Sequence, residues 1–201
     1  MDPSEKSSYK EHISTKITSF YEKKLRQEAF NNSRMTYFNV TTQGLRGRTH
    51  PAICDLLTVY QVKLARPHIK MLMGDYATLA IKSMQSGGSP DCIMCTGNYS
   101  ESICHLIASC SALAEERAQI LTKYEQLCTD TIAKLDLNQI IANEETFCQF
   151  VLDPTSLNLK VRVNINDPLV SEFFKLSREF CFLIDKLRTE TMNRNKPKCL
   201  Q

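Results

Sequence analysis

The feature of this sequence that most constrains its fold is a set of four potential metal ligands gathered within nineteen residues. Cys92, Cys95, His105 and Cys110 form the pattern Cys-x2-Cys-x9-His-x4-Cys. Zinc binds thiolates and imidazoles tetrahedrally, and three cysteines with one histidine make a closed structural site that leaves no position for a substrate. The pattern therefore predicts one zinc ion near the middle of the chain, where it would hold the fold.

The third ligand of this site has an alternative. Cys104 is adjacent to His105 and would complete a site of four cysteines. We prefer His105, because it lies five residues before Cys110, and two residues at this spacing can lie near each other across one turn of a short helix.

Disulfide bonds are the other interpretation of a chain with nine cysteines. They require an oxidising compartment, whereas the sequence starts with a polar segment, Met1-Asp2-Pro3-Ser4-Glu5-Lys6, that does not resemble a signal peptide. An odd number of cysteines also pairs incompletely. We therefore expect an intracellular protein, cytoplasmic or nuclear and not secreted, in which the other cysteines are buried apolar side chains or exposed thiols.

Length and composition are those of a globular protein. The 201 residues, of which 42% are hydrophobic, suffice for one full core or two small ones. The net charge of +3 is compatible with a nucleic-acid partner but lies far below the basic balance that would indicate one by itself. No apolar run reaches the roughly eighteen residues of a membrane span.

Apolar periodicity near 3.6 residues predicts a mainly α-helical, bundle-like protein with a single zinc knuckle inserted near its middle. Helices are expected over 8–30, from 51 to a break or kink at Pro67, over 69–84 and 113–127, in short pieces over 136–152, and from 168 to 187. Four regions follow: an amphipathic helix with a basic loop (1–50), a helical zinc-binding module (51–130), a C-terminal helical segment (131–193) and a disordered basic tail (194–201).

Two features near the C-terminus refine this outline. Apolar and polar residues alternate over 157–166, which is the period of a strand. Because we find no partner strand, we expect an extended segment lying on the helices. The last helix then begins with Asp167 as cap and Pro168 in the first turn, and Arg178 and Arg188 are expected mostly off its apolar face.

Several stretches together resemble a known family. They are Arg66-Pro67-His68-Ile69-Lys70-Met71-Leu72-Met73-Gly74-Asp75-Tyr76, Gln85-Ser86-Gly87-Gly88-Ser89-Pro90, the four-ligand motif with Glu101 and Arg117, Val163-Asn164-Ile165-Asn166-Asp167-Pro168 and Ser177-Arg178-Glu179-Phe180-Cys181. Over about residues 50–190 the chain resembles the carboxy-terminal region of reverse transcriptases from non-long-terminal-repeat (LINE-type) retrotransposons.

This resemblance implies that the four motif residues bind zinc and that the region is a non-catalytic accessory, which helps an upstream polymerase to hold RNA or DNA. The Tyr-x-Asp-Asp motif of a polymerase is absent from the sequence, as is a paired-carboxylate set for two catalytic metals. We therefore expect no polymerase activity. The chain would be a fragment or a non-functional remnant of such an element, or a detached tail kept for another use.

Nucleic-acid binding by such a chain would be weak and salt-sensitive. Tyr99 is the candidate for stacking on a base, and phosphate contacts are predicted for the basic side chains Arg46, Arg48, Arg117, Lys160 and Arg162.

Two other classes of function stay open. A zinc-pinned protein-interaction module would use the helix over 8–30 to pack on another protein, including the missing polymerase domain. Catalysis is the least favoured class, because no nucleophile motif is present and the Cys92-x2-Cys95 pair lacks a thioredoxin-like context. Glu101 is the nearest candidate base for an open zinc site.

Overall fold

The computed structural model describes residues 3–31, 35–38, 50, 52–131, 137–156 and 168–195. These residues are mainly α-helical, and the only strand-like pairing among them is an isolated antiparallel bridge between Asp91 and Ser100. The elements are α1 (Pro3–Asn31), α3 (Val59–Leu72), α4 (Leu79–Ser86), η1 (His105–Ser109), η2 (Ser111–Leu113), α5 (Ala114–Thr131), α6 (Leu137–Ile141), α7 (Glu144–Leu152), η3 (Pro154–Ser156) and α8 (Pro168–Arg194). The prediction of a mainly α-helical protein is confirmed.

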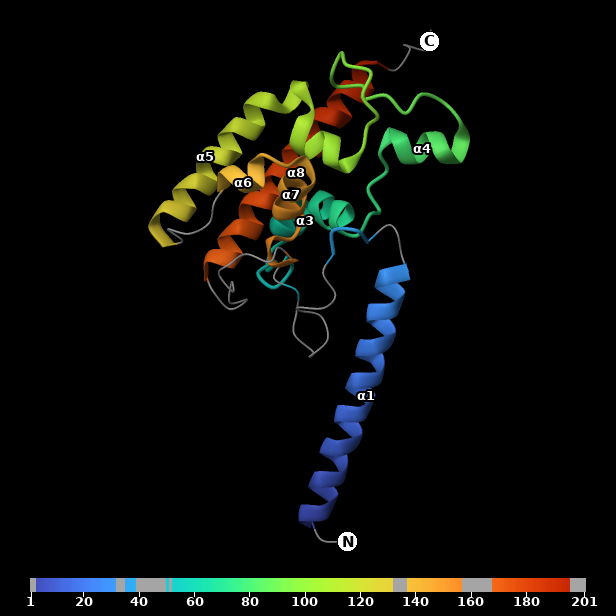
Figure 1. Cartoon of the computed structure of the whole chain (residues 1–201), viewed down its shortest axis with the longest axis vertical. Helices are drawn as coiled ribbons and strands as arrows, with labels where there is room; N and C mark the ends of the chain where they lie inside the picture. Colours follow the sequence, from blue (N-terminus) through green and yellow to red (C-terminus); the bar gives the residue numbers. More distant parts are fainter. Residues whose placement is uncertain are drawn as a thin grey trace.

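α8 is the central helix of the helical body, which comprises α3 to α8 (Figure 1). It packs against α3, α5 and α7, and it also contacts η1, the short π-helical turn that begins at His105. α1 instead projects away from this helical body (Figure 1). Within the described residues, no helix has the length and apolar character that a membrane span requires.

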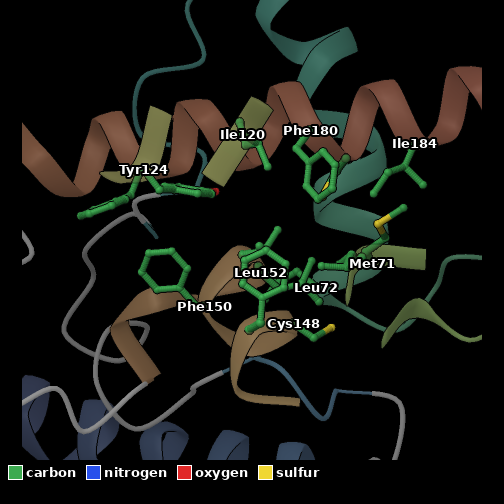
Figure 2. Packing of buried hydrophobic residues seen from close by; sticks show 14 of the residues in the cluster. Met71, Leu72, Ile120, Tyr124, Cys148, Phe150, Leu152, Phe180 and Ile184 are labelled. Atoms are coloured by element: carbon green, nitrogen blue, oxygen red, sulfur yellow. The ribbon is translucent and has the colours of Figure 1, made fainter. Parts of the chain in front are cut away.

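The core lies where α3, α5, α7 and α8 meet (Figure 2). Its side chains include Met71, Leu72, Ile120, Tyr124, Cys148, Phe150, Leu152, Phe180 and Ile184, all buried. The ring of Tyr124 contacts that of Phe150 edge-on, with 5.0 Å between the centroids. Each fully buried side chain of this size stabilises the fold by about 1.5–3 kcal/mol. The predicted regions 51–130 and 131–193 thus contribute to one apolar cluster.

Local sequence explains where two of these helices begin. Thr58 Oγ1 accepts a hydrogen bond from the Gln61 backbone N–H (3.2 Å), and Gln61 Oε1 accepts one from the Thr58 N–H (2.9 Å), which makes a capping box at the start of α3. Asn143 caps α7 by accepting from the Thr146 N–H at 2.8 Å, and two glutamates follow in the first turn.

The expected boundaries of the two helices over 51–84 were wrong. α3 begins at Val59 and continues through Pro67, and the chain then leaves the helix before α4. Gly74 adopts a φ of +69°, and the Asp75 and Gly74 N–H groups donate to the carbonyls of Lys70 (2.8 Å) and Met71 (3.1 Å). This is a Schellman motif, which ends helices where glycine supplies the left-handed conformation.

The prediction for the two arginines of α8 was also wrong. The helix starts at Pro168 and buries its apolar residues as expected, but Arg178 and Arg188 are buried with them. Arg178 makes a two-bond ion pair with Asp55, at 2.6 and 2.7 Å, and this guanidinium lowers the pKa of the Asp55 carboxyl. The arginines are buried because each has a carboxylate partner.

Three other predictions fall on residues outside the described ranges. They are the basic loop over 44–50 apart from His50, the extended segment over 157–166 with the Asp167 cap, and the tail beyond Asn195. Arg194, expected in the tail, still belongs to α8.

Candidate metal centre

The four predicted ligands come from one loop and one helical turn. Cys92 and Cys95 lie in the knuckle loop, residues 90–101, which joins α4 to η1. The Cys92 N–H donates to the Tyr99 carbonyl and the Glu101 N–H to the Pro90 carbonyl, both at 2.8 Å. These two bonds close the loop on itself, so its two cysteines face the turn that follows.

The other two ligands are brought together by η1. His105 is its first residue, and the Cys110 N–H donates to the His105 carbonyl at 2.7 Å. This hydrogen bond between residues five apart is the π-helical pattern, and single π-helical turns occur often at functional sites. The short helical turn expected between His105 and Cys110 is therefore present as a π-helical turn, which brings these two residues together.

The potential ligand atoms of Cys92, Cys95, His105 and Cys110 all lie within 4.8 Å of one another. The Cys92 and Cys110 sulfur atoms are 3.9 Å apart, and the Cys95 sulfur lies 3.4 Å from His105 Nε2. A tetrahedral ion with metal–sulfur bonds of about 2.3 Å and a metal–nitrogen bond of about 2.0 Å would place these pairs about 3.8 and 3.5 Å apart. These two distances match a tetrahedral ion, and the four side chains together could hold a metal ion.

Cys92 and Cys110 lie close enough to affect each other's protonation. Cys92 and Cys110 share a hydrogen bond, which lowers the pKa of Cys92 and raises that of Cys110. One thiolate thus forms readily, whereas a second beside it is opposed by repulsion and by burial. Metal binding requires both sulfurs as thiolates, and the positive charge of the ion would offset the repulsion between them.

His105 is oriented by its surroundings. Its Nδ1 lies 3.4 Å from Ser109 Oγ, and the ring of Tyr99 stacks on it with 5.5 Å between centroids and 24° between planes. Contacts of this kind to the second nitrogen and to the ring face fix the orientation of a metal-ligating histidine. Nε2 is therefore held toward the cysteines.

The knuckle loop is anchored to α8 by a buried ion pair. Glu101 Oε1 accepts from Arg188 Nη2 (2.7 Å), from Arg188 Nε (3.0 Å) and from the Leu79 N–H at the start of α4 (2.7 Å). Arg188 Nη2 also donates to the Ala77 carbonyl at 3.1 Å. Glu101 thus belongs to the scaffold of the site and lies outside the group of potential ligand atoms.

The residues predicted to bind nucleic acid are placed differently from one another. Tyr99 is exposed beside His105. Arg117 bends back to the knuckle and donates to the carbonyls of Ile107 (3.2 Å) and Cys110 (2.9 Å). Its burial lowers the pKa of the guanidinium. The others, Arg46, Arg48, Lys160 and Arg162, lie outside the described residues.

From sequence, Cys104 was the alternative third ligand, and the ion pair of Arg188 was not predicted. Cys104 is not in the ligand group, and its thiol lies beside that of Cys148, which lowers the pKa of Cys104. No disulfide joins the cysteines that the structure describes. The role of Arg188 could have been read from spacing, since Phe180, Ile184 and Arg188 follow one another at four-residue intervals on one helix face.

Comparison of the chain with protein-family models, curated proteins and solved structures gives no match. Three sulfur atoms and one imidazole nitrogen would fill all four positions of a tetrahedral ion bound here. Such a set stabilises a fold.

Proposed function

We propose that this protein is a zinc-stabilised, non-catalytic nucleic-acid-binding module, similar to the carboxy-terminal region of LINE-type reverse transcriptases. The observation that carries the proposal is the closed cluster of Cys92, Cys95, His105 and Cys110, whose ligand atoms lie within 4.8 Å of one another. A centre with no position left for a substrate supports a binding role over a catalytic one.

The chemistry of the donors favours zinc over other ions. Calcium and magnesium select oxygen ligands, which this group does not offer. Soft thiolates combined with imidazole in a tetrahedron suit zinc, which has no geometric preference of its own to satisfy. Glu101, a carboxylate of the knuckle loop, is held by Arg188 and lies outside the ligand group.

Two features support a nucleic-acid partner, in addition to the sequence resemblance. The side chain of Tyr99 is 64% exposed, while its stacking on His105 holds the ring in one orientation. An aromatic ring fixed on one face offers its other face to a base, at about 1–3 kcal/mol per stacked base. The chain also carries a positive net charge of +3, which favours association with phosphates.

Fluorescence anisotropy with a labelled single-stranded RNA tests this function. With the zinc-loaded chain we expect salt-sensitive binding that Tyr99→Ala weakens about 10-fold. Tyr60→Ala is the matched control, because Tyr60 is an equally exposed tyrosine on α3, away from the metal centre. An RNA affinity too weak to measure, or one that Tyr99→Ala leaves unchanged, would contradict the proposal.

A protein-interaction module is the second candidate, and one observation favours it. α1 projects from the helical body and exposes five large apolar or aromatic side chains: Tyr9, Ile13, Ile17, Phe20 and Tyr21. Exposed apolar patches of this kind often mark a protein interface. Under this candidate, light scattering should show an oligomer that Ile13→Lys with Ile17→Lys makes monomeric, and the same variant would leave RNA binding unchanged under the first candidate.

A further inference from the structure

A second potential site is lined by Arg188, the ion-pair partner of Glu101. A cavity of about 250 Å³ opens there between α3, α4 and α8. Its lining is Arg66, Pro67, Lys70, Tyr76, Ala77, Lys82, Asp185 and Arg188. We call it the basic pocket.

The charges of the basic pocket do not balance. Arg66 is exposed, whereas Lys70 and Lys82 are half-buried, and within the described chain none of the three has an ion-pair or side-chain hydrogen-bond partner. Arg188 is neutralised by Glu101 at 2.7 Å. Three cations therefore face the single remaining carboxylate, Asp185.

That carboxylate is itself engaged. Asp185 Oδ1 accepts a hydrogen bond from the Tyr76 hydroxyl at 3.0 Å, and the Tyr76 ring in turn lies under the Arg188 guanidinium, 5.4 Å from its carbon atom. The wall formed by Tyr76, Asp185 and Arg188 is thus held in place without help from the three other cations. The ammonium groups of Lys70 and Lys82 are not among the buried atoms that lack a partner, so they reach solvent, and an anion in the pocket would pair with them without displacing another contact.

We propose that the basic pocket binds a phosphate group. Lysine and arginine side chains that line one pocket are the usual recognition elements for phosphate. The cavity is about eight times the ~30 Å³ of one water molecule, so the phosphate can carry substituents, as a phosphodiester does. If the phosphate comes from a nucleic-acid backbone, this inference rests on the proposed function; free phosphate is the other source of the same chemistry.

The test compares two double variants of the full, zinc-loaded chain. Lys70→Gln with Lys82→Gln removes two pocket charges and leaves the Glu101–Arg188 pair in place. Lys63→Gln with Lys123→Gln removes the same charge from exposed positions outside the pocket. Arg66→Gln, at an exposed pocket residue, is the second pocket variant in case the first does not fold.

Two measurements distinguish the sources of the phosphate. In the first, labelled single-stranded RNA should bind the pocket variant at least about 5-fold more weakly than the control variant, with a salt dependence shallower by about 0.7 per lost phosphate contact. In the second, inorganic phosphate should raise the melting temperature of the wild-type chain above that in chloride of equal ionic strength, and the pocket variants should lose this rise.

Either difference supports a phosphate site, and the first also assigns it to nucleic acid. Pocket variants that match the control in both measurements would overturn the inference. A wild-type chain that fails to bind RNA would contradict the proposed function, while the measurement with inorganic phosphate would still decide the basic pocket. The two failures are therefore distinguishable.

Discussion

Glu101 and Arg188 form an ion pair in which the side chains are 0% and 7% exposed, with 2.7 Å between the charged groups. One partner ends the knuckle loop and the other lies in the final helix, so the pair connects the metal centre directly to α8. Arg188 also lines the basic pocket, together with Tyr76 and Asp185. A buried pair of this kind adds little net stability, but its loss from one side leaves a buried charge without a partner.

Arg188→Met should lower the free energy of unfolding by about 3–5 kcal/mol, because it leaves the Glu101 carboxylate buried and unpaired. Adding Glu101→Gln to this variant should restore a large part of the loss. Lys123→Met is the control, since Lys123 pairs with Glu179 at 3.7 Å with both side chains exposed, and such pairs contribute less than about 1 kcal/mol. Urea unfolding curves measure all three. Equal stability of Arg188→Met and Lys123→Met would show that the pair does not anchor the loop.

Removal of the metal should unfold the knuckle. Chelation, or Cys110→Ser, is expected to lower the free energy of unfolding by more than about 3 kcal/mol, because binding of a structural zinc contributes directly to folding. Cys54→Ser changes an exposed cysteine outside the ligand group and serves as the control. Thermal unfolding followed by circular dichroism measures the effect. Curves that chelator and Cys110→Ser leave unchanged would exclude a structural metal.

Gly97→Ala should separate the role of the Tyr99 ring from the presence of the metal. A Cβ atom on Gly97 would overlap Cδ2 and Cε2 of Tyr99, so the ring must leave its position on His105. We expect RNA affinity to fall about as far as in Tyr99→Ala, that is about 10-fold, with the zinc content unchanged. Thr96→Ala, at an exposed neighbouring residue, is the control. RNA binding that survives Gly97→Ala would show that the stacked ring is not the base platform.

His68 should make the protein less stable in mild acid. Its side chain is fully buried, its Nε2–H donates to the Leu152 carbonyl at 2.9 Å, and burial lowers its pKa from the usual 6.5 to about 4. The unfolded chain therefore takes up a proton below about pH 6.5 that the folded protein accepts only near pH 4, so stability falls as the pH falls through this window.

From pH 7 to pH 5 this linkage amounts to about 2 kcal/mol. His68→Gln keeps a hydrogen-bond donor but cannot titrate, so the loss of stability over this range should be about 2 kcal/mol smaller than in the wild type. His12→Gln, on the exposed side of α1, should behave like the wild type. Denaturant titrations at the two pH values check this, and an identical pH dependence in His68→Gln would refute the assignment.

The parts of this structure that sequence predicts best depend on short-range spacing. One loop brings Cys92 and Cys95 together, and one helical turn brings His105 near Cys110. Spacing along the sequence therefore suffices to predict that these four side chains meet. The face of α8 from Leu169 to Ile184 follows the 3.6-residue period, and that face is buried. Both features arise within about twenty residues of chain.

The parts that sequence misses depend on partners far along the chain or on a single backbone conformation. Glu101 and Arg188 are 87 residues apart, and Asp55 and Arg178 are 123 apart, so local spacing could place Arg188 on the buried face but could not identify the carboxylate partner of either arginine. The apolar period over 69–84 continues across the break between α3 and α4 although no residue of α4 is buried, so the pattern alone did not show where the helix ends. Gly74 was the signal that this helix ends.

The most direct test of this account is the zinc content of the reduced full-length chain by native mass spectrometry, with Cys95→Ser and Cys104→Ser measured beside it. We predict one zinc per wild-type chain, none in Cys95→Ser, and one in Cys104→Ser, because the Cys104 sulfur is not in the ligand group. A wild-type chain without zinc would contradict the central claim, as would zinc that Cys95→Ser retains. If Cys104→Ser lost its zinc, Cys104 would be the third ligand in place of His105.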